Sequence, residues 1–243
     1  PNRFLAQVWP TLLPYLRHPL QALRQVYLAY LLRTYRMLDF RGIPQLESFS
    51  REMPLEDVYV PLLARPELPA GETWERRLAG RTLPEGMLPE EAPVLEQLDA
   101  NPSIPIEQAL KSNHQVVILG DPGSGKSTLL KFIALNQAAA PDAALPVLVP
   151  LNAYARALQG GDLNLQAFLP RFFAGFSEEL STLQPLFDDA LGHGRVFILL
   201  DGLDEVQDHR ASLVQKVEAF ASMAVEKGNQ VVVTSRIVGY REA

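Results

Sequence analysis

Short apolar runs rich in β-branched residues mark the second half of the chain, and stretches of mixed character separate them. These runs predict strands at 115–120, 145–151, 195–201 and 230–235. The run at 195–201 is apolar without interruption from Val196 to Leu200, as expected for a strand buried on both faces. Helix-forming stretches follow the first three runs, at 129–139, 164–192 and 208–227. From residue 113 onward this alternation predicts an α/β fold, with a parallel sheet flanked by helices.

The first 43 residues show a different pattern. Apolar residues recur at helical spacing between Pro19 and Leu38, and the arginines of this segment greatly outnumber its one acid, Asp39. We therefore predict a basic amphipathic helical N-terminal segment over 1–43 that packs on its own domain. A partner helix or an anionic membrane surface would use the arginine face, and both stay open as alternatives.

Residues 44–112 are dominated by proline, which ends or kinks helices. The prolines lie at positions 44, 54, 61, 66, 69, 84, 89, 93, 102 and 105. They predict a proline-rich connector that wraps the following domain and contains no long helix. Within it, the alternation at 58–60 predicts a short extended segment, and 106–112 predicts a helix.

Composition narrows the classes of function. Cysteine is absent, which excludes disulfides and thiolate metal sites, and the four histidines show no metal-ligand spacing. A net charge of −6 argues against a nucleic-acid partner. The longest uncharged N-terminal run, 4–16, is too short to span a bilayer, and Pro10 and Pro14 interrupt it. We expect a soluble, cytoplasmic protein.

The first strand runs into a glycine-rich turn that leads into a helix, which is the context of a phosphate-binding P-loop. Glycines allow the backbone N–H groups to point at one anion, and the helix start adds the positive end of its dipole. Lys126 is expected between the β- and γ-phosphates, and Ser127 on Mg²⁺. A dinucleotide site is a weaker interpretation, because its third glycine is missing. The candidate nucleotide-binding residues are Gly120, Asp121, Pro122, Gly123, Ser124, Gly125, Lys126, Ser127 and Thr128.

The third strand ends in an acidic turn, Asp201-Gly202-Leu203-Asp204-Glu205. A carboxylate at the carboxyl end of a buried strand faces the crevice where such sheets bind ligands, so Asp201 is a candidate Mg²⁺ ligand opposite Ser127. Glu205 is our favoured candidate for the base that polarises a water, with Asp204 as a second acid near the metal. The alternative is an acidic turn that only caps the next helix.

Arg236 follows the fourth strand and completes the candidate catalytic set with Glu205 and Asp204. A guanidinium at this place would contact the γ-phosphate and report whether it is present. The alternative is a surface arginine at a strand end.

Three of these segments resemble the motifs of the NACHT family of STAND-type signal-transduction P-loop NTPases: 120–127, 197–205 and 232–236. More loosely, 35–43 and 55–62 resemble the lead-in of bacterial NACHT proteins. The resemblance implies ATP or ADP as nucleotide with Mg²⁺, a resting state with ADP, and self-association when ATP replaces it. It also implies a sensor role for Arg236. The family continues beyond this motif with further strands and helical domains, so we expect 113–243 to be an incomplete NACHT-like domain.

These observations favour an ATP-binding, slowly hydrolysing NTPase module of a signalling switch. The alternatives are a nucleotide-binding module without turnover and a truncated regulatory fragment. A P-loop kinase is disfavoured, because the acid pair Asp204-Glu205 suits the activation of water.

Overall fold

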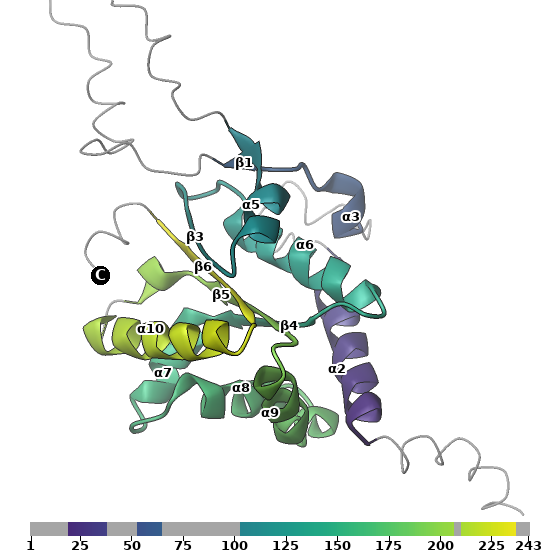
Figure 1. Cartoon of the computed structure of the whole chain (residues 1–243), viewed down its shortest axis with the longest axis vertical. Coiled ribbons are helices and arrows are strands. Elements are labelled where there is room, and N and C mark those ends of the chain that lie inside the picture. The colour runs from purple at the N-terminus through teal and green to yellow at the C-terminus, as the bar shows by residue number, and fades with distance from the viewer. Residues whose placement is uncertain (1–18, 38–52, 65–102, 207–209, 237–243) are drawn as a thin grey trace, which may run out of the picture. The chain divides into compact units, whose positions relative to one another are not determined.

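The computed structural model describes residues 19–37, 53–64, 103–206 and 210–236 (Figure 1). The chain forms two compact units. The larger comprises Pro1–Tyr59 and His114–Ala243, and the smaller comprises Val60–Asn113. The expected division into 1–43, 44–112 and 113–243 stays a prediction.

The larger unit is built on a four-stranded parallel sheet with the strand order β3-β6-β5-β4. The strands are β3 (Gln115–Leu119), β4 (Leu145–Pro150), β5 (Val196–Asp201) and β6 (Gln230–Ser235). Both central strands, β5 and β6, are almost wholly buried. This fits the apolar run Val196–Leu200 of β5 and the three valines of β6, whose Thr234 and Ser235 are buried polar residues. The predicted parallel α/β sheet is confirmed. Because the strands are parallel, their carboxyl ends meet at one edge, where ligands of such sheets bind.

Helices cover the sheet. They are α6 (Lys126–Ala139), α7 (Leu151–Leu158), α8 (Leu165–Ala174), α9 (Gln184–Gly192) and α10 (Arg210–Glu226), with short 3₁₀ turns η3 (Glu178–Leu180) and η4 (Leu203–Glu205). In Figure 1, α6 lies on one side of the sheet, and α8 and α10 lie on the other. The helical span predicted at 164–192 is confirmed as α8, η3 and α9.

Helix α7 was not predicted, and the second strand is shorter than expected. The strand stops at Pro150, and Leu151 is the first residue of the helix. Leu151 and Tyr154 are both fully buried, so the apolar run continues across the boundary although the backbone changes from strand to helix. The spacing of apolar residues over such a short run does not distinguish a strand from a helix.

Helix α2 (Pro19–Tyr35) packs beside α6 in the same unit, which confirms the helix predicted here. Tyr27 and Leu31 are fully buried. The Tyr27 hydroxyl donates to the carbonyl of Pro146 in edge strand β4 at 2.8 Å, and burial raises the pKa of this phenol well above its usual value. The phenol therefore satisfies an acceptor that no neighbouring described strand reaches. This packing favours the interpretation of a helix docked on its own domain.

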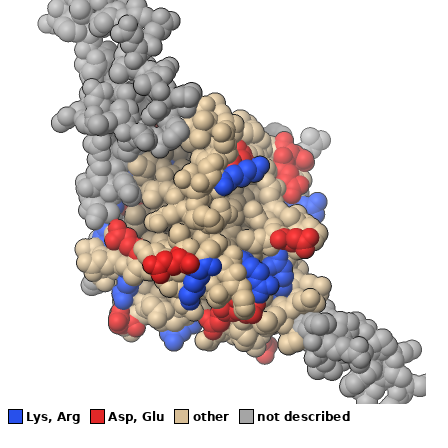
Figure 2. Space-filling view, in the orientation of Figure 1, with Lys and Arg blue, Asp and Glu red and all other residues tan. Residues whose placement is uncertain are grey.

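Membrane contact through 1–43 stays a prediction, because residues 1–18 and 38–43 lie outside the described ranges. Among the described residues, no helix has the length and apolarity needed to cross a bilayer. On the face shown in Figure 2, basic and acidic side chains of the described residues are interspersed, without a continuous basic stripe.

The extended segment predicted at 58–60 was wrong at its first residue. Val58 was expected in an extended segment, but it ends the short helix α3 (Leu55–Val58), and the following Tyr59 is extended, with φ −68° and ψ 125°. Pro54 precedes the helix, and Glu56 and Asp57 lie in its first turn, where acidic side chains favour helix formation. The Tyr59 ring then stacks on Phe132 of α6, with centroids 3.7 Å apart.

The described part of the smaller unit contains an antiparallel pair, β1 (Leu63–Ala64) and β2 (Ile104–Pro105), and helix α5 (Ile106–Ser112). The helix predicted at 106–112 is confirmed. The N–H of Ile106 donates to the carbonyl of Leu62 at 3.1 Å and ties the helix start to the first strand.

Candidate functional site

The loop between β3 and α6 takes a conformation that requires its glycines. Gly123 and Gly125 have φ of +76° and +85°, in the left-handed region that other residues avoid. At Gly120, an added Cβ would lie 2.8 Å from the Ser124 Oγ. The loop leads directly into α6, whose first turn offers N–H groups without a helical acceptor and the positive end of the dipole. This arrangement suits an anion.

The Lys126 side chain folds across this loop. Its Nζ donates to the carbonyls of Gly120 at 2.7 Å and Asp121 at 2.9 Å, and to the Ser124 hydroxyl at 3.2 Å. An ammonium group has three N–H donors, so neutral loop oxygens account for all of them. Phosphate oxygens would form stronger, charge-assisted bonds in their place. The Lys126 ammonium is therefore held over the loop, where it can bind an anionic ligand.

Asp201, at the end of β5, is oriented by a residue from the neighbouring strand. The Thr234 hydroxyl in β6 donates to the Asp201 Oδ1 at 2.6 Å and accepts the Gly202 N–H at 2.9 Å. Thr234 is fully buried. A carboxylate can accept about four hydrogen bonds, and the Thr234 hydroxyl supplies only one of them, to Oδ1. The remaining lone pairs of Asp201 can therefore accept other donors or bind a metal ion.

Asp204 and Arg236 form a two-point contact. The Arg236 backbone N–H donates to the Asp204 Oδ1 at 2.8 Å, and its Nε lies 2.8 Å from Oδ2. The Asp204 side chain is only 8% exposed, whereas that of Arg236 is 53% exposed. Both oxygens of the buried carboxylate are thus occupied by Arg236, while the exposed end of the guanidinium stays accessible.

Glu205 has a different environment from its neighbour. Its side chain is exposed, and its Oε2 accepts a hydrogen bond from the Asn152 Nδ2 at 3.0 Å. Gly202, with φ of +76°, lies against the Glu205 side chain, and a Cβ added at Gly202 would come within 2.9 Å of the Glu205 Cδ. The glycine therefore provides the space in which the glutamate side chain lies.

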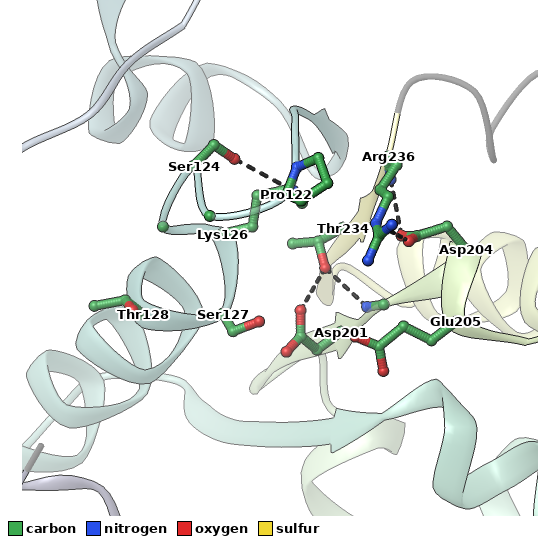
Figure 3. A pocket seen from close by; sticks show the side chains of 13 residues that line it. Pro122, Ser124, Lys126, Ser127, Thr128, Asp201, Asp204, Glu205, Thr234 and Arg236 are labelled. Atoms are coloured by element: carbon green, nitrogen blue, oxygen red, sulfur yellow. Dashed lines mark hydrogen bonds and ion pairs between the residues drawn. The ribbon is translucent and has the colours of Figure 1, made fainter. Parts of the chain in front are cut away.

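A cavity of about 290 Å³ joins these groups at the carboxyl edge of the sheet (Figure 3). Its volume is at the lower end of the range of about 300–1,000 Å³ for small-molecule sites. All predicted site residues except Gly120 and Asp121, which belong to the loop backbone, line it. The complete lining is Pro122, Gly123, Ser124, Gly125, Lys126, Ser127, Thr128, Asp201, Gly202, Asp204, Glu205, Thr234 and Arg236.

The family model for the NACHT domain matches residues 114–242. The chain belongs to the NACHT family. Residues 114–242 are therefore a nucleotide-binding NTPase module, and the P-loop lies in its expected place between the first strand of the domain and the helix that follows. The search of curated proteins gave no match to the chain.

The donor set of this NACHT domain fits Mg²⁺ bound together with phosphates. Within the described ranges, no group of three or more His, Asp or Glu side chains could hold a metal ion by itself. Mg²⁺ in nucleotide sites uses one or two protein oxygens and completes its shell with phosphate oxygens and water. The Ser127 hydroxyl and the Asp201 carboxylate line the same cavity and match that requirement.

Sequence reasoning assigned no role to Thr234 and Asn152, whose side chains contact the candidate residues Asp201 and Glu205. Thr234 is a polar residue that directly follows the three apolar residues Val231, Val232 and Val233 in a buried strand, and that pattern was a usable signal. Asn152 lies in α7, the helix that was not predicted, and nothing local to it indicates a contact with Glu205.

Replacing Thr234 by valine is expected to raise the Mg²⁺ concentration needed for nucleotide binding by about 10-fold to 100-fold, as found when the hydrogen-bond partners of metal ligands are removed. Valine has the same shape but leaves the Gly202 N–H and Asp201 without their partner. Thr234→Ser keeps the hydroxyl and should retain most of the Mg²⁺ response. A Mg²⁺ titration of nucleotide binding measures the effect. An unchanged midpoint in the valine variant would contradict the role of the hydroxyl.

Proposed function

We propose that this NACHT domain binds ATP with Mg²⁺ and hydrolyses it slowly, as the NTPase module of a signalling switch. The observation that supports this most directly is that Lys126, Asp201, Glu205 and Arg236 line the same cavity. A phosphate-binding lysine, a metal-ligand candidate, a base candidate and a cation surround one space there. Slow turnover and exchange of ADP for ATP follow from the resemblance to switch NTPases.

In this proposal the loop binds the phosphates and the acidic turn completes the site. The N–H groups of 123–128 and the Lys126 ammonium hold the β- and γ-phosphate oxygens. Ser127 and Asp201 hold Mg²⁺, which neutralises phosphate charge when it is bound. The Thr234 hydroxyl keeps the Asp201 carboxylate in one orientation.

Glu205 is the base of the proposed hydrolysis. It accepts a proton from a water molecule whose oxygen attacks the γ-phosphorus, and the bond from that phosphorus to the β–γ bridging oxygen breaks. The products are ADP and inorganic phosphate. Both oxygens of Asp204 are bound to Arg236, whereas among the described residues only one oxygen of Glu205 has a side-chain partner, so the geometry favours Glu205 over Asp204 for this task.

Arg236 is the proposed γ-phosphate sensor. Asp204 anchors its backbone N–H and Nε, and within the part of the chain that the structure describes the terminal guanidinium N–H groups remain for the phosphate.

Arg236→Ala is therefore expected to weaken ATP binding by about 10-fold to 100-fold, the value of about 1.5–3 kcal/mol for a hydrogen bond to a charged group, and ADP binding by less than about 3-fold. Titration calorimetry with Mg²⁺-ATP and Mg²⁺-ADP measures both affinities, and Arg171→Ala, an exposed arginine of α8, is the matched control. Equal losses for the two nucleotides would exclude a sensor role.

The complete proposal is tested by measuring nucleotide binding and phosphate release on the purified chain. Binding with slow phosphate release supports it. Binding without release would favour the nucleotide-binding module without turnover, and sedimentation with ADP and with ATP would test self-association through the NTPase domain. A cytoplasmic location and the absence of a nucleic-acid partner stay predictions from the sequence.

A further inference from the structure

Helix α7 brings one polar side chain to the carboxyl edge of the sheet. It begins directly after β4, and Asn152 is its second residue. The helix packs against η4, the 3₁₀ turn that carries Asp204 and Glu205. The residues in contact, Asn152 and Glu205, are 53 positions apart in the sequence. The contact therefore depends on the fold and not on local chain geometry.

Two residues restrain the Glu205 side chain, Gly202 by close packing and Asn152 by a hydrogen bond. Its backbone N–H donates to the Gly202 carbonyl at 3.1 Å, and its Cγ and Cδ lie in the space that the missing side chain of Gly202 leaves. The Asn152 amide then binds Oε2 at 3.0 Å. An exposed glutamate would otherwise sample several rotamers, so this bond selects one orientation of the carboxylate.

The two adjacent acids have partners of different charge. Asp204 is paired with the guanidinium of Arg236, while Glu205 is bound by a neutral amide. A neutral donor orients a carboxylate without placing an opposite charge beside it. Such a partner suits a group that has to accept a proton.

We propose that Asn152 is a positioning residue for Glu205, holding Oε2 so that Oε1 receives the proton of the attacking water. This inference rests on the proposed function, because it concerns the base of that hydrolysis. Misplacement of a reacting group by about 1 Å can cost about 100-fold in rate, so the orientation of Glu205 is expected to control turnover without controlling nucleotide binding.

The principal test is Asn152→Asp, which keeps the shape of the side chain, removes the N–H donor and adds a negative charge next to Glu205. An aspartate in the first turn of a helix is favoured by the helix dipole, so α7 should not be weakened. We expect phosphate release to fall by about 10-fold to 100-fold, while the Kd for Mg²⁺-ATP stays within about 3-fold and Tm does not fall. Asn136→Ala, an exposed asparagine of α6, is the matched control.

A double-mutant cycle separates this inference from the proposed function. In the Glu205→Ala background, adding Asn152→Asp should cause no further loss of turnover, because the group that it positions is gone. If Glu205→Ala alone retains turnover, the assignment of the base fails. If Glu205→Ala loses turnover but Asn152→Asp does not, the positioning role of Asn152 fails. Losses that multiply in the double variant would also overturn it.

A second readout does not depend on turnover. In a ¹⁵N-labelled chain, the side-chain amide signals of Asn152 are identified by their absence from the Asn152→Asp spectrum. We expect them to shift in Glu205→Ala and to stay in place in Glu218→Gln, an exposed glutamate of α10. Unchanged Asn152 signals in Glu205→Ala would show that the contact is not formed in solution and would overturn the inference.

Discussion

Lys126→Ala is expected to weaken the binding of Mg²⁺-ATP and Mg²⁺-ADP by at least about 100-fold, which corresponds to about 2.8 kcal/mol. The ammonium lies over the phosphate-binding loop, where it donates to three loop oxygens. In the complex, phosphate oxygens replace some of them with charge-assisted bonds, each worth about 1.5–3 kcal/mol. Alanine removes these bonds and leaves only the backbone N–H groups to bind the phosphates.

Titration calorimetry on the purified chain measures this effect. The matched control is Lys131→Ala, the other lysine of α6, which does not line the cavity and should bind nucleotide as the unmodified chain does. Since Lys126→Ala also removes hydrogen bonds inside the loop, thermal unfolding of the variant has to be recorded beside the titration. A folded variant with unchanged affinity would show that this loop is not the phosphate site.

Glu205→Gln is expected to lower phosphate release by about 100-fold to 10,000-fold, the usual contribution of a general base, and to change the Kd for Mg²⁺-ATP by less than about 3-fold. Glutamine has nearly the same size, so it fits the space beside Gly202 and still accepts the hydrogen bond from Asn152. Only the capacity to take a proton is lost. The substitution therefore separates chemistry from binding more cleanly than a truncation does.

Single-turnover phosphate release and calorimetry together measure this split between rate and affinity. Glu218→Gln, an exposed glutamate of α10, serves as the control and should retain the full rate. If Glu205→Gln keeps the rate, the next candidate is Asp204. Asp204→Asn would then have to be compared with Arg236→Ala, because the two side chains share one ion pair.

The elements that the sequence by itself determined are those whose cause is local. The strands follow four apolar runs that alternate with helices, the pattern of a parallel sheet covered by helices, and the run 115–119 leads into a loop whose Gly123 and Gly125 need positive φ. The helices at 19–35 and 106–112 follow from residue spacing and flanking prolines. Within α7 the same reasoning failed, because an apolar run that passes from strand to helix carries no local marker of the change.

Only the tertiary structure decided the contacts that orient the candidate groups. Thr234 reaches Asp201 because β6 lies beside β5, and Asn152 reaches Glu205 because α7 packs on η4. Far along the chain, Tyr27 satisfies a carbonyl of edge strand β4, 119 positions away. Periodicity tells which face of an element is buried, but it does not tell which element lies next to it. Strand order and helix packing depend on the burial of the whole chain, and hydrogen bonds between distant residues form only once that packing is complete.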